Sequence, residues 1–442
     1  MPTRRQLLKS GMFAGILGVA GCQSFQGSQR PRETNVTETP GQDSTQSAQT
    51  RQSTQTSTDS SHHDIRDYGA RVDGETDDTG AINDALAATG PGETVVFPAG
   101  KTRVWANERG AITLDGSVAD DVTITGAGRS TVVELLSTND SRNQWCFGID
   151  GSGSPIRGLT IRNMRISGNK HENSNRSAFG INMYPGGTGH SILIEDIETF
   201  DSSGKGLSVN GGEIRLNRIT SHGNTGHGIN LKGANTEWGS VPVTVTNAVC
   251  VDNAGTGIDH NEGSASIDGF WLENNAGGNK VTSKAKESWW RNGTFLRNGI
   301  GGFRYNGPVE TQDYNPMRIH LDDLLSVENH HSGFYFAGDV RYDIGTIVAR
   351  RNNTGNEDRG NVHITGQADI DAEAIYSENA LHGYGLFYYS DSNSNAELYQ
   401  HTGNPEKSIG GNLKNLQLEE SVEGAAPDIS TPSKSDLGAA FH

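Results

Sequence analysis

The stretch IRLNRITSHGNTGHGINLK, residues 214–232, is one copy of a unit that recurs along the chain. A run of β-branched residues leads to an asparagine or serine, then to glycines, and then to a second alternating run. Further copies begin near residues 194, 243, 267, 293 and 320. A unit of this length cannot bury its apolar face alone, so we expect each unit to form one coil that packs on its neighbours. The repeat therefore predicts a solenoid.

Asparagine keeps one place in the repeat, at spacings of 22 to 31 residues. Asparagine side chains that stack in register can hydrogen-bond along the axis of the stack. We therefore interpret these residues as a structural ladder. Its expected members are Asn224, Asn253, Asn275, Asn298, Asn329, Asn352 and Asn379.

A different pattern precedes the repeats, in the stretch DIRDYGARVDGETDDTGAINDALAATGPGETVVFPAGKTRV, residues 64–104. Asp77 and Asp78 mark the start of a helix, Ile82 and Leu86 belong to its apolar stripe, and TGPG ends it. A short buried strand, TVVFPAG, follows. This stretch resembles the N-terminal signature of the pectate lyase superfamily. The resemblance implies an all-β fold, a right-handed parallel β-helix with a short N-terminal capping α-helix.

The two ends of the chain differ in composition from the repeats. Residues 1–22 carry the twin arginine Arg4-Arg5, a short apolar run and the sequence VAGC, which resembles a lipoprotein signal with Cys22 as the lipidated residue. A cleaved signal without lipid is the alternative. Residues 23–62, rich in Ser, Thr and Gln, are expected to form a disordered tether. The β-helix domain is then expected over 63–418, with a loosely ordered tail over 419–442. We expect an exported protein, either held at the outer face of the cell membrane or secreted.

The chain has a strong acidic excess. It has 442 residues, 53 of them acidic and 36 basic, for a net charge of −17. This argues against a nucleic-acid partner, because no basic patch is present to neutralise phosphates. It suits a halophilic source or an ordinary acidic secreted protein. Cys146 and Cys250 lie far apart in the sequence, and we expect two buried thiols, although a disulfide stays open.

Side chains alternate between the two faces of a strand, so aligning the units on their glycines predicts which residues point outward. Charge is concentrated at Asp259, Lys280 and Arg304, with Lys232 beside them, while Glu262 is expected on the bordering loop. His260 is expected to point inward and to be packed. The first outward column is Asn182, Ser208, Asn230, Asp259, Lys280, Arg304, Tyr335 and His363, and the second is Tyr184, Asn210, Lys232, Asn261, Thr282 and Asn306.

The segment GIDHN, residues 257–261, resembles the G-F-D-x-N coil of β-helical polysaccharide lyases. The resemblance implies β-elimination of an acidic, uronate-containing polysaccharide, with Lys232, Lys280, Arg304 and Asp259 as catalytic residues. In such enzymes the preceding coil carries a lysine. Here that coil is GINLKG, with Asn230 in the usual place and Lys232 two residues later.

A calcium ion and a set of sugar-binding residues belong to the same hypothesis. Asp259, Glu262 and Asp252 supply the oxygen ligands that calcium prefers. Aromatic and amide side chains along the face are expected to contact sugar rings. They are Asn230, Asn261, Asn306, Tyr184 and Tyr335, with Trp238 as a further aromatic residue.

Two alternatives stay open at this stage. A glycoside hydrolase needs two carboxylates across the scissile bond, and Asp259 with Glu262 or Asp201 provides such a pair. A GHG triplet at 226–228 matches one hydrolase motif, but no adjacent DD coil precedes it. The other alternative is a non-catalytic, glycan-binding or surface-structural β-helix. The expected partner in each case is an acidic polysaccharide or cell-surface glycan, bound by a monomer or a trimer.

Overall fold

The structure of the protein is a computed structural model. It describes residues 61–106, 110–137, 143–174, 177–184, 189–233, 242–307, 317–356, 360–403 and 407–438. The expected signal with Cys22, the expected tether up to residue 60 and the aromatic residue Trp238 lie outside these residues, whereas His62, the last tether residue, begins strand β1. Within them, no helix has the length and apolar composition needed to cross a bilayer.

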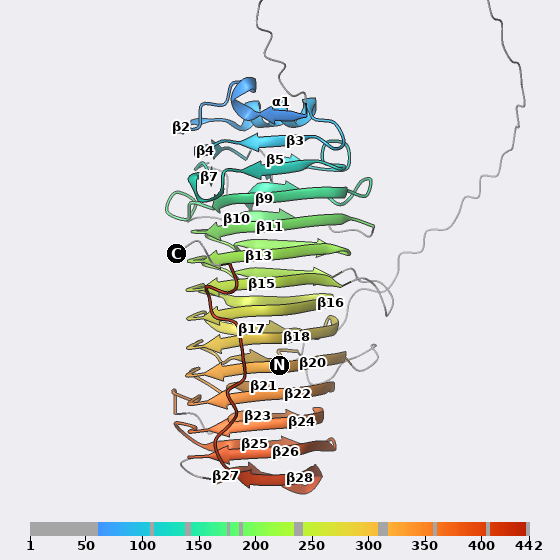
Figure 1. Ribbon diagram of the computed structural model, residues 1–442, viewed down its shortest axis with the longest axis vertical. Coiled ribbons are helices and arrows are strands. Elements are labelled where there is room, and N and C mark those ends of the chain that lie inside the picture. Colours follow the sequence, from blue (N-terminus) through green and yellow to red (C-terminus); the bar gives the residue numbers. More distant parts are fainter. Residues whose placement is uncertain are drawn as a thin grey trace, which may run out of the picture. The chain divides into compact units, whose positions relative to one another are not determined.

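The described chain winds into a stack of coils whose strands pair in parallel with those of the next coil, as β11 with β13, β12 with β14 and β21 with β23 (Figure 1). Three sheets line the stack. Sheet A contains β1(His62–Asp64), β2(Asp73–Asp77), β3(Thr94–Phe97), β4(Gly100–Val104), β6(Thr123–Gly126), β7(Thr131–Leu135), β9(Arg157–Ser167), β11(Ser191–Phe200), β13(Ile214–His222), β15(Val243–Val251), the second part of β16(Thr256–Glu273), β18(Ala285–Leu296), β20(Met317–Val327), β22(Val340–Arg350), β24(Asp369–Glu378), β26(Ser394–Thr402) and β28(Leu416–Glu423). Sheet B contains β5(Gly110–Leu114), β8(Gln144–Ile149), β10(Ala178–Met183), β12(Leu207–Gly211), β14(Ile229–Gly233), the first part of β16 and β17(Gly277–Val281), and sheet C contains β19(Phe303–Arg304), β21(Phe334–Phe336), β23(Gly360–Gly366), β25(Tyr384–Ser390) and β27(Lys407–Gly411). The predicted parallel β-helix is confirmed.

The interior of the stack is filled by the inward side chains of successive coils. Phe270 packs on Trp290 with ring centroids 5.5 Å apart, and Phe303 packs on Phe336 at 6.0 Å. These four rings are fully buried. Burial of one such ring stabilises the fold by about 1.5–3 kcal/mol, so the coils are held mainly by contacts with their neighbours.

The asparagine ladder is present at one corner of the coils. Each side-chain amide donates to the Oδ1 atom of the next asparagine, at 2.9 Å for Asn224 to Asn253 and 2.8 Å for Asn329 to Asn352. Asn253, Asn275 and Asn298 continue it in the same way. The backbone amide of Asn352 then donates to Oδ1 of Asn361 at 3.0 Å, so Asn361 takes the place that the spacing assigned to Asn379. Asn361 follows Asn352 by only nine residues and lies in β23, so a pattern with one asparagine per unit does not predict it.

A helix lies at the N-terminal end of the stack, where the sequence predicts one (Figure 1). α1(Thr79–Ala88) buries Ile82, Ala85 and Leu86. Asp78 precedes it and is buried, but its carboxylate accepts from the backbone amides of Arg71 and Val72 at 2.7 and 3.1 Å. Asp78 therefore fixes the preceding loop and does not cap the helix. Three short 3₁₀ turns complete the helical elements described: η1(Ile65–Tyr68), η2(Gly128–Ser130) and η3(Leu413–Asn415).

The C-terminal segment differs from the loosely ordered tail expected after residue 418. β28 continues to Glu423, and residues 424–438 run back along sheet A (Figure 1). Leu437 is only 2% exposed and packs on Val249, Val251 and Trp271. Lys434 forms an ion pair with Glu273. One buried leucine and this ion pair hold a segment whose polar composition predicts no order.

The two cysteines of the described residues are free and buried. The Cys146 thiol donates to the carbonyl oxygen of Ser167 at 3.3 Å. Burial raises the pKa of both thiols, so they stay protonated and behave as small apolar core residues.

Candidate functional site

Strand register places the first outward column as the alternation predicts. In sheet B, Asn182 pairs with Ser208, Ser208 with Asn230, Asn230 with Asp259, and Asp259 with Lys280. Sheet C continues the line, because Arg304 pairs with Tyr335 and Tyr335 with His363. A bridge between Val281 and Tyr305 joins the two sheets and sets Arg304 beside Lys280. We call this line of eight residues the outward column.

Glycines allow neighbouring coils to approach closely just before this column. A Cβ atom on Gly228 would lie 2.7 Å from the carbonyl oxygen of Gly257, and one on Gly257 would lie 2.8 Å from that of Gly278. Since any side chain would collide with the next coil, glycine is required at both positions. The coils that carry Asn230, Asp259 and Lys280 are therefore stacked in contact.

Asp259 lies at the centre of the charged part of the column and is only 1% exposed. Its Oδ2 atom accepts from Nδ2 of Asn230 at 3.2 Å and from Nδ2 of Asn261 at 3.1 Å. Nε2 of His227 lies 3.2 Å from the same oxygen, and Nζ of Lys280 lies 3.4 Å from Oδ1. The carboxylate points outward as predicted, but these four side chains cover it. The carboxylate is therefore closed off from solvent and holds these side chains from below.

Basic side chains gather around this single buried carboxylate. We define the cationic cluster as Lys205, His227, Lys232, Lys280 and Arg304. Nζ of Lys205 donates to Oδ1 of Asn230 at 2.5 Å, which links it to the network of Asp259. Lys232, Lys280 and Arg304 are each partly exposed on the outer face. A chain with a net charge of −17 thus presents a local concentration of positive charge on this face, which corrects the expectation that no basic patch is present.

Burial changes the proton affinity of several members of the cluster. It lowers the pKa of Lys205, of His227 and of Arg304, in each case as the leading cause, while attraction to Asp259 acts in the opposite direction. Nδ1 of His227 accepts from the backbone amide of Thr256 at 2.9 Å. A neutral His227 therefore carries its proton on Nε2 and donates it to Asp259. Lys205 is partly buried, and lowering the pKa of a lysine by burial is one way in which a protein prepares an amine as a base.

A small hollow of about 120 Å³ adjoins the cluster and is lined by three predicted site residues, Arg304, Asn306 and Tyr335. Nε of Arg304, the hydroxyl of Tyr305 and Oγ of Ser332 are buried there without a hydrogen-bond partner in the described residues. Buried polar groups normally have partners. The hollow is therefore suited to a polar ligand that reaches Arg304.

Two positions differ from the sequence prediction because β16 carries a bulge. Leu231 pairs with His260, but Lys232 then pairs with Glu262, so the register shifts by one residue. Glu262 thus lies within the strand beside Lys232 and not on a bordering loop, and Asn261 moves out of the second column toward Asp259. His260 is fully buried as predicted, and its ring nitrogens contact Oγ of Ser288 at 2.9 Å and the carbonyl oxygen of Gly263 at 3.1 Å.

The three carboxylates predicted to bind calcium do not form a ligand set. Asp252 lies at a coil corner with a left-handed backbone (φ 55°) and an exposed side chain, seven positions before Asp259. The oxygens of Asp259 face amides, an imidazole and an ammonium group. Among the described residues, no group of three or more His, Cys, Asp or Glu side chains is arranged to hold a metal ion. The residues present do not fit calcium.

Lys205 and His227 were missed by the sequence analysis. They stand three residues before Ser208 and Asn230, so they occupy the same place in consecutive units. Strand alternation gives directions only from the glycine that begins each strand, and these two residues precede that glycine. A signal was present, because basic residues at one position of two adjacent repeats are expected to lie side by side.

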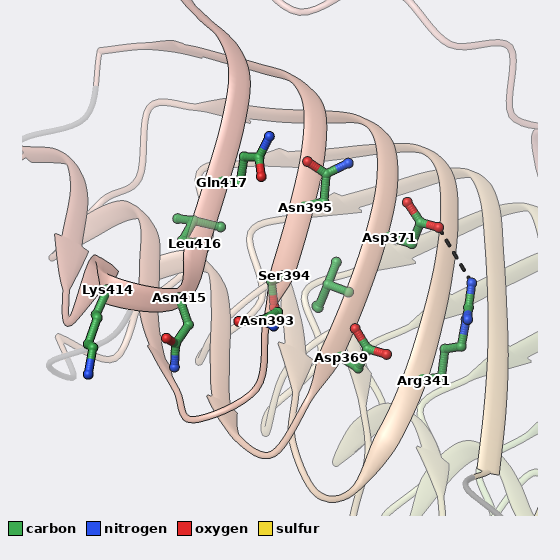
Figure 2. A pocket seen from close by; sticks show the side chains of 11 residues that line it. Arg341, Asp369, Asp371, Asn393, Ser394, Asn395, Lys414, Asn415, Leu416 and Gln417 are labelled. Carbon is green, nitrogen blue, oxygen red and sulfur yellow. Dashed lines mark hydrogen bonds and ion pairs between the residues drawn. The ribbon is translucent and has the colours of Figure 1, made fainter.

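A different hollow, of about 540 Å³, lies on sheet A near the C-terminal end (Figure 2). Asp371, Asn395 and Gln417 stand in register on successive strands there. Figure 2 shows Arg341 facing Asp371, with Nη2 and Oδ2 3.5 Å apart. This hollow is on a sheet that does not carry the outward column, so it is separate from the candidate site.

Comparison with known proteins agrees with the fold. A family model described as rhamnogalacturonase A/epimerase, pectate lyase-like, matches residues 63–154. Mannuronan C5-epimerase AlgE4 of Azotobacter vinelandii is 34% identical over 166 residues, which are 35% of this chain and 29% of that protein. Alginate lyase 7 of the same organism is 30% identical over 146 residues, 31% of this chain and 16% of that protein. The alignments thus span less than a third of either relative.

Solved structures give the same result over a longer part of the chain. The A-module of mannuronan C5-epimerase AlgE6 of Azotobacter vinelandii matches with a TM-score of 0.62 at 17% identity, covering 83% of this chain and all of that module. The AlgE4 A-module matches with a TM-score of 0.56 at 16% identity, covering 84% of this chain and all of that module. At this identity the likeness concerns the fold. The chain has a pectate lyase-like parallel β-helix fold.

Proposed function

We propose that the protein acts on an acidic polysaccharide, at a uronate unit bound on the outer face of β14, β16, β17 and β19, and that it cleaves this polymer by β-elimination. One observation carries the proposal. In a strongly acidic chain, Lys205, His227, Lys232, Lys280 and Arg304 are gathered around one buried carboxylate on one face. Such a cluster attracts a polyanion and holds its carboxylates.

Neutralising the carboxylate of a uronate makes the proton on its C5 atom removable. Arg304 and Lys280 are in register on adjacent coils and partly exposed, and Arg304 lines the hollow with an unpaired Nε. We assign them to the sugar carboxylate. Asp259 holds Lys280 and His227 in place from below.

The base that removes the C5 proton is a lysine of the same cluster. Lys232 is the candidate from the sequence, and it stands on the second column beside Glu262. Lys205 is the candidate from the structure, because burial lowers its pKa and so raises the fraction of neutral amine. The base takes the C5 proton, the electron pair of that bond forms a double bond between C4 and C5, and the bond between C4 and the glycosidic oxygen breaks. The leaving oxygen takes a proton from water and becomes a hydroxyl group of the neighbouring sugar.

Epimerisation at C5 is the second candidate, and the similarity to mannuronan C5-epimerase AlgE4 favours it. It begins with the same proton removal, but the proton returns to the opposite face of the ring and the chain stays intact. Both reactions therefore need the same carboxylate-binding cations. They differ in what happens to the oxygen at C4.

The hydrolase alternative finds less support in the geometry. A glycosidase needs two carboxyl groups that reach the scissile bond. Asp259 is 1% exposed and surrounded by donors, and Asp201 lies on a turn where it pairs with Lys170 at 3.1 Å. Neither is presented on the face as a free acid or nucleophile.

Incubation with polymannuronate, polyguluronate and polygalacturonate tests the proposal. A lyase produces ultraviolet-absorbing unsaturated ends and shorter chains. An epimerase changes the ratio of mannuronate to guluronate without producing unsaturated ends or shorter chains. New reducing ends without absorbance would indicate hydrolysis, and an unchanged panel would leave a non-catalytic, glycan-binding β-helix; either result would overturn the proposal.

A further inference from the structure

A wide pocket of about 630 Å³ lies at the N-terminal end of the face that carries the cationic cluster. Its walls come from the first turn of α1, the segment after β4, strands β5 and β8, and the residue after β10. None of the reactions above uses it. The chemistry of its lining differs from that of the cluster, and it points to a different ligand.

The pocket exists because the outward column lacks a side chain on this coil. Gly148 pairs with Asn182 in the register and so takes the place that polar or charged residues hold on later coils. A Cβ on Gly148 would lie 2.4 Å from Nε1 of Trp145, and one on Gly110 would lie 3.0 Å from the same atom. The indole of Trp145 therefore lies across two glycines and forms part of the floor.

Three aromatic side chains line this pocket. Trp145 is 7% exposed and is fixed by an edge contact with Phe179, with ring centroids 6.0 Å apart. Trp105 and Tyr184 are 41% and 53% exposed, which is unusual for rings of this size. Exposed aromatic faces in a concave site stack on the apolar faces of sugar rings.

Two carboxylates are among the polar groups of the lining, beside Thr79, Asn83 and Thr113. Oδ1 of Asp77 accepts from the backbone amide and the hydroxyl of Thr79 at 3.0 and 2.6 Å. Oδ1 of Asp150 accepts from the same two groups of Ser152 at 2.9 and 2.6 Å. Each carboxylate is thus held by one oxygen, and within the described residues the other oxygen has no hydrogen bond. Two fixed acceptors suit the hydroxyl groups of a sugar.

The charge of the lining selects against a uronate. Its described residues include two carboxylates and no Lys, Arg or His. A carboxylate brought close to two others is repelled, whereas the cationic cluster attracts it. Four coil steps separate Gly148 from Asp259 in the register, which is roughly 19 Å at about 4.8 Å per coil. One face therefore presents an aromatic, acidic end and a cationic end.

We propose that the pocket formed by Trp105, Trp145, Tyr184, Asp77 and Asp150 binds a neutral pyranose unit. The sugar ring stacks on the aromatic faces and its hydroxyl groups donate to the two carboxylates. The neutral unit comes either from the polymer whose uronate lies at the cluster or from a separate neutral glycan. Because the pocket shares no residue with the cluster, this proposal stands or falls independently of the proposed function.

Quenching of tryptophan fluorescence by neutral hexasaccharides of glucose, mannose and galactose, in α and β linkages, and by hexamers of mannuronate and galacturonate tests this site. We expect at least one neutral hexamer to bind, and Trp105→Ala to weaken that binding about tenfold. Tyr389→Ala, which removes a 63% exposed ring from sheet C, is the matched control and should bind as the parent does. Because both rings are exposed, both variants should melt as the parent does, and melting curves check that neither variant has a folding defect.

Three outcomes would overturn this proposal: no neutral hexamer binds, Trp105→Ala binds as tightly as the parent, or uronate hexamers bind through Trp105. The two sources of the sugar are separated by kinetics on polymers that the protein cleaves or epimerises. Trp105→Ala raises KM for a polymer with neutral units if the two sites share one chain, and leaves it unchanged if they do not. If the protein binds a neutral hexamer but modifies no uronate polymer, the pocket proposal stands and the proposed function is wrong.

Discussion

Replacing Asp259 by asparagine removes one negative charge from beneath the cationic cluster while keeping the shape of the side chain. The two oxygens of Asp259 face only donors: amides of Asn230 and Asn261, the imidazole of His227 and the ammonium group of Lys280. An asparagine at 259 can still accept at one oxygen. Its amide group then faces the ammonium of Lys280, where a donor meets a donor.

The size of the effect follows from these contacts. Hydrogen bonds to a charged group contribute about 1.5–3 kcal/mol each. The contacts of His227 and Lys280 with residue 259 would no longer be made to a charged group. The side chains of His227 and Lys280 are 24% and 19% exposed, respectively, so water replaces part of what they lose. We therefore expect Asp259→Asn to lower the free energy of unfolding by about 2–4 kcal/mol. This differs from an outward, exposed aspartate, which the sequence alone suggests and which would leave the melt unchanged.

Chemical denaturation followed by circular dichroism measures this change, with Asp371→Asn as the matched control. Asp371 carries the same charge but is 62% exposed on sheet A, so its replacement should cost about 0.5 kcal/mol or less. Turnover on the active polymer should also fall in Asp259→Asn, since Lys280 loses its anchor. Equal stability of the two variants would show that the carboxylate of Asp259 does not hold the cationic cluster.

Four further predictions follow from particular contacts. Arg304→Ala should reduce turnover about 100-fold or more because the sugar carboxylate loses its partner, while Arg215→Ala, at a 68% exposed arginine of sheet A, should retain full activity. Turnover should persist in the presence of a calcium chelator, because basic side chains of the protein neutralise the carboxylate of the sugar. A loss of activity that added calcium restores would contradict this. Burial lowers the pKa of His260 to about 4, below the 6.5 of an ordinary histidine. The stabilisation that the neutral imidazole gives is therefore complete above pH 6.5 and is lost as the pH falls toward 4, and the free energy of unfolding should drop by about 2 kcal/mol at pH 5. An NMR titration in which the His260 imidazole protonates near pH 6.5 would contradict this. Leu437→Ala should cost about 2 kcal/mol locally and speed amide exchange in residues 424–438 while the β-helix stays protected; unchanged exchange would show that Leu437 does not hold the segment.

The repeat made the fold and the outward column predictable, because both depend on local patterns. Each coil must bury alternate side chains, so Asn230, Asp259 and Lys280 fall in one line once the glycines are aligned. The asparagine ladder follows from the same argument, up to the coil where Asn361 replaces Asn379.

The parts that the sequence did not predict depend on contacts between coils. The bulge that sets Glu262 beside Lys232 comes from a one-residue difference between two neighbouring strands, which neither strand shows alone. The burial of Asp259 comes from side chains on the coils to either side of it. His227 and Lys205 join it from turns, where alternation gives no direction.

In the proposed reaction, a base of the cationic cluster removes the C5 proton of a uronate. Proton NMR of the polymer that the protein modifies, recorded in deuterated buffer, follows this proton directly. The C5 proton signal should decline with turnover, because elimination removes that proton and epimerisation replaces it with deuterium. Arg304→Ala should leave the signal almost constant over the same time. A C5 proton that persists while the polymer is shortened, or while it is only bound, would contradict the account.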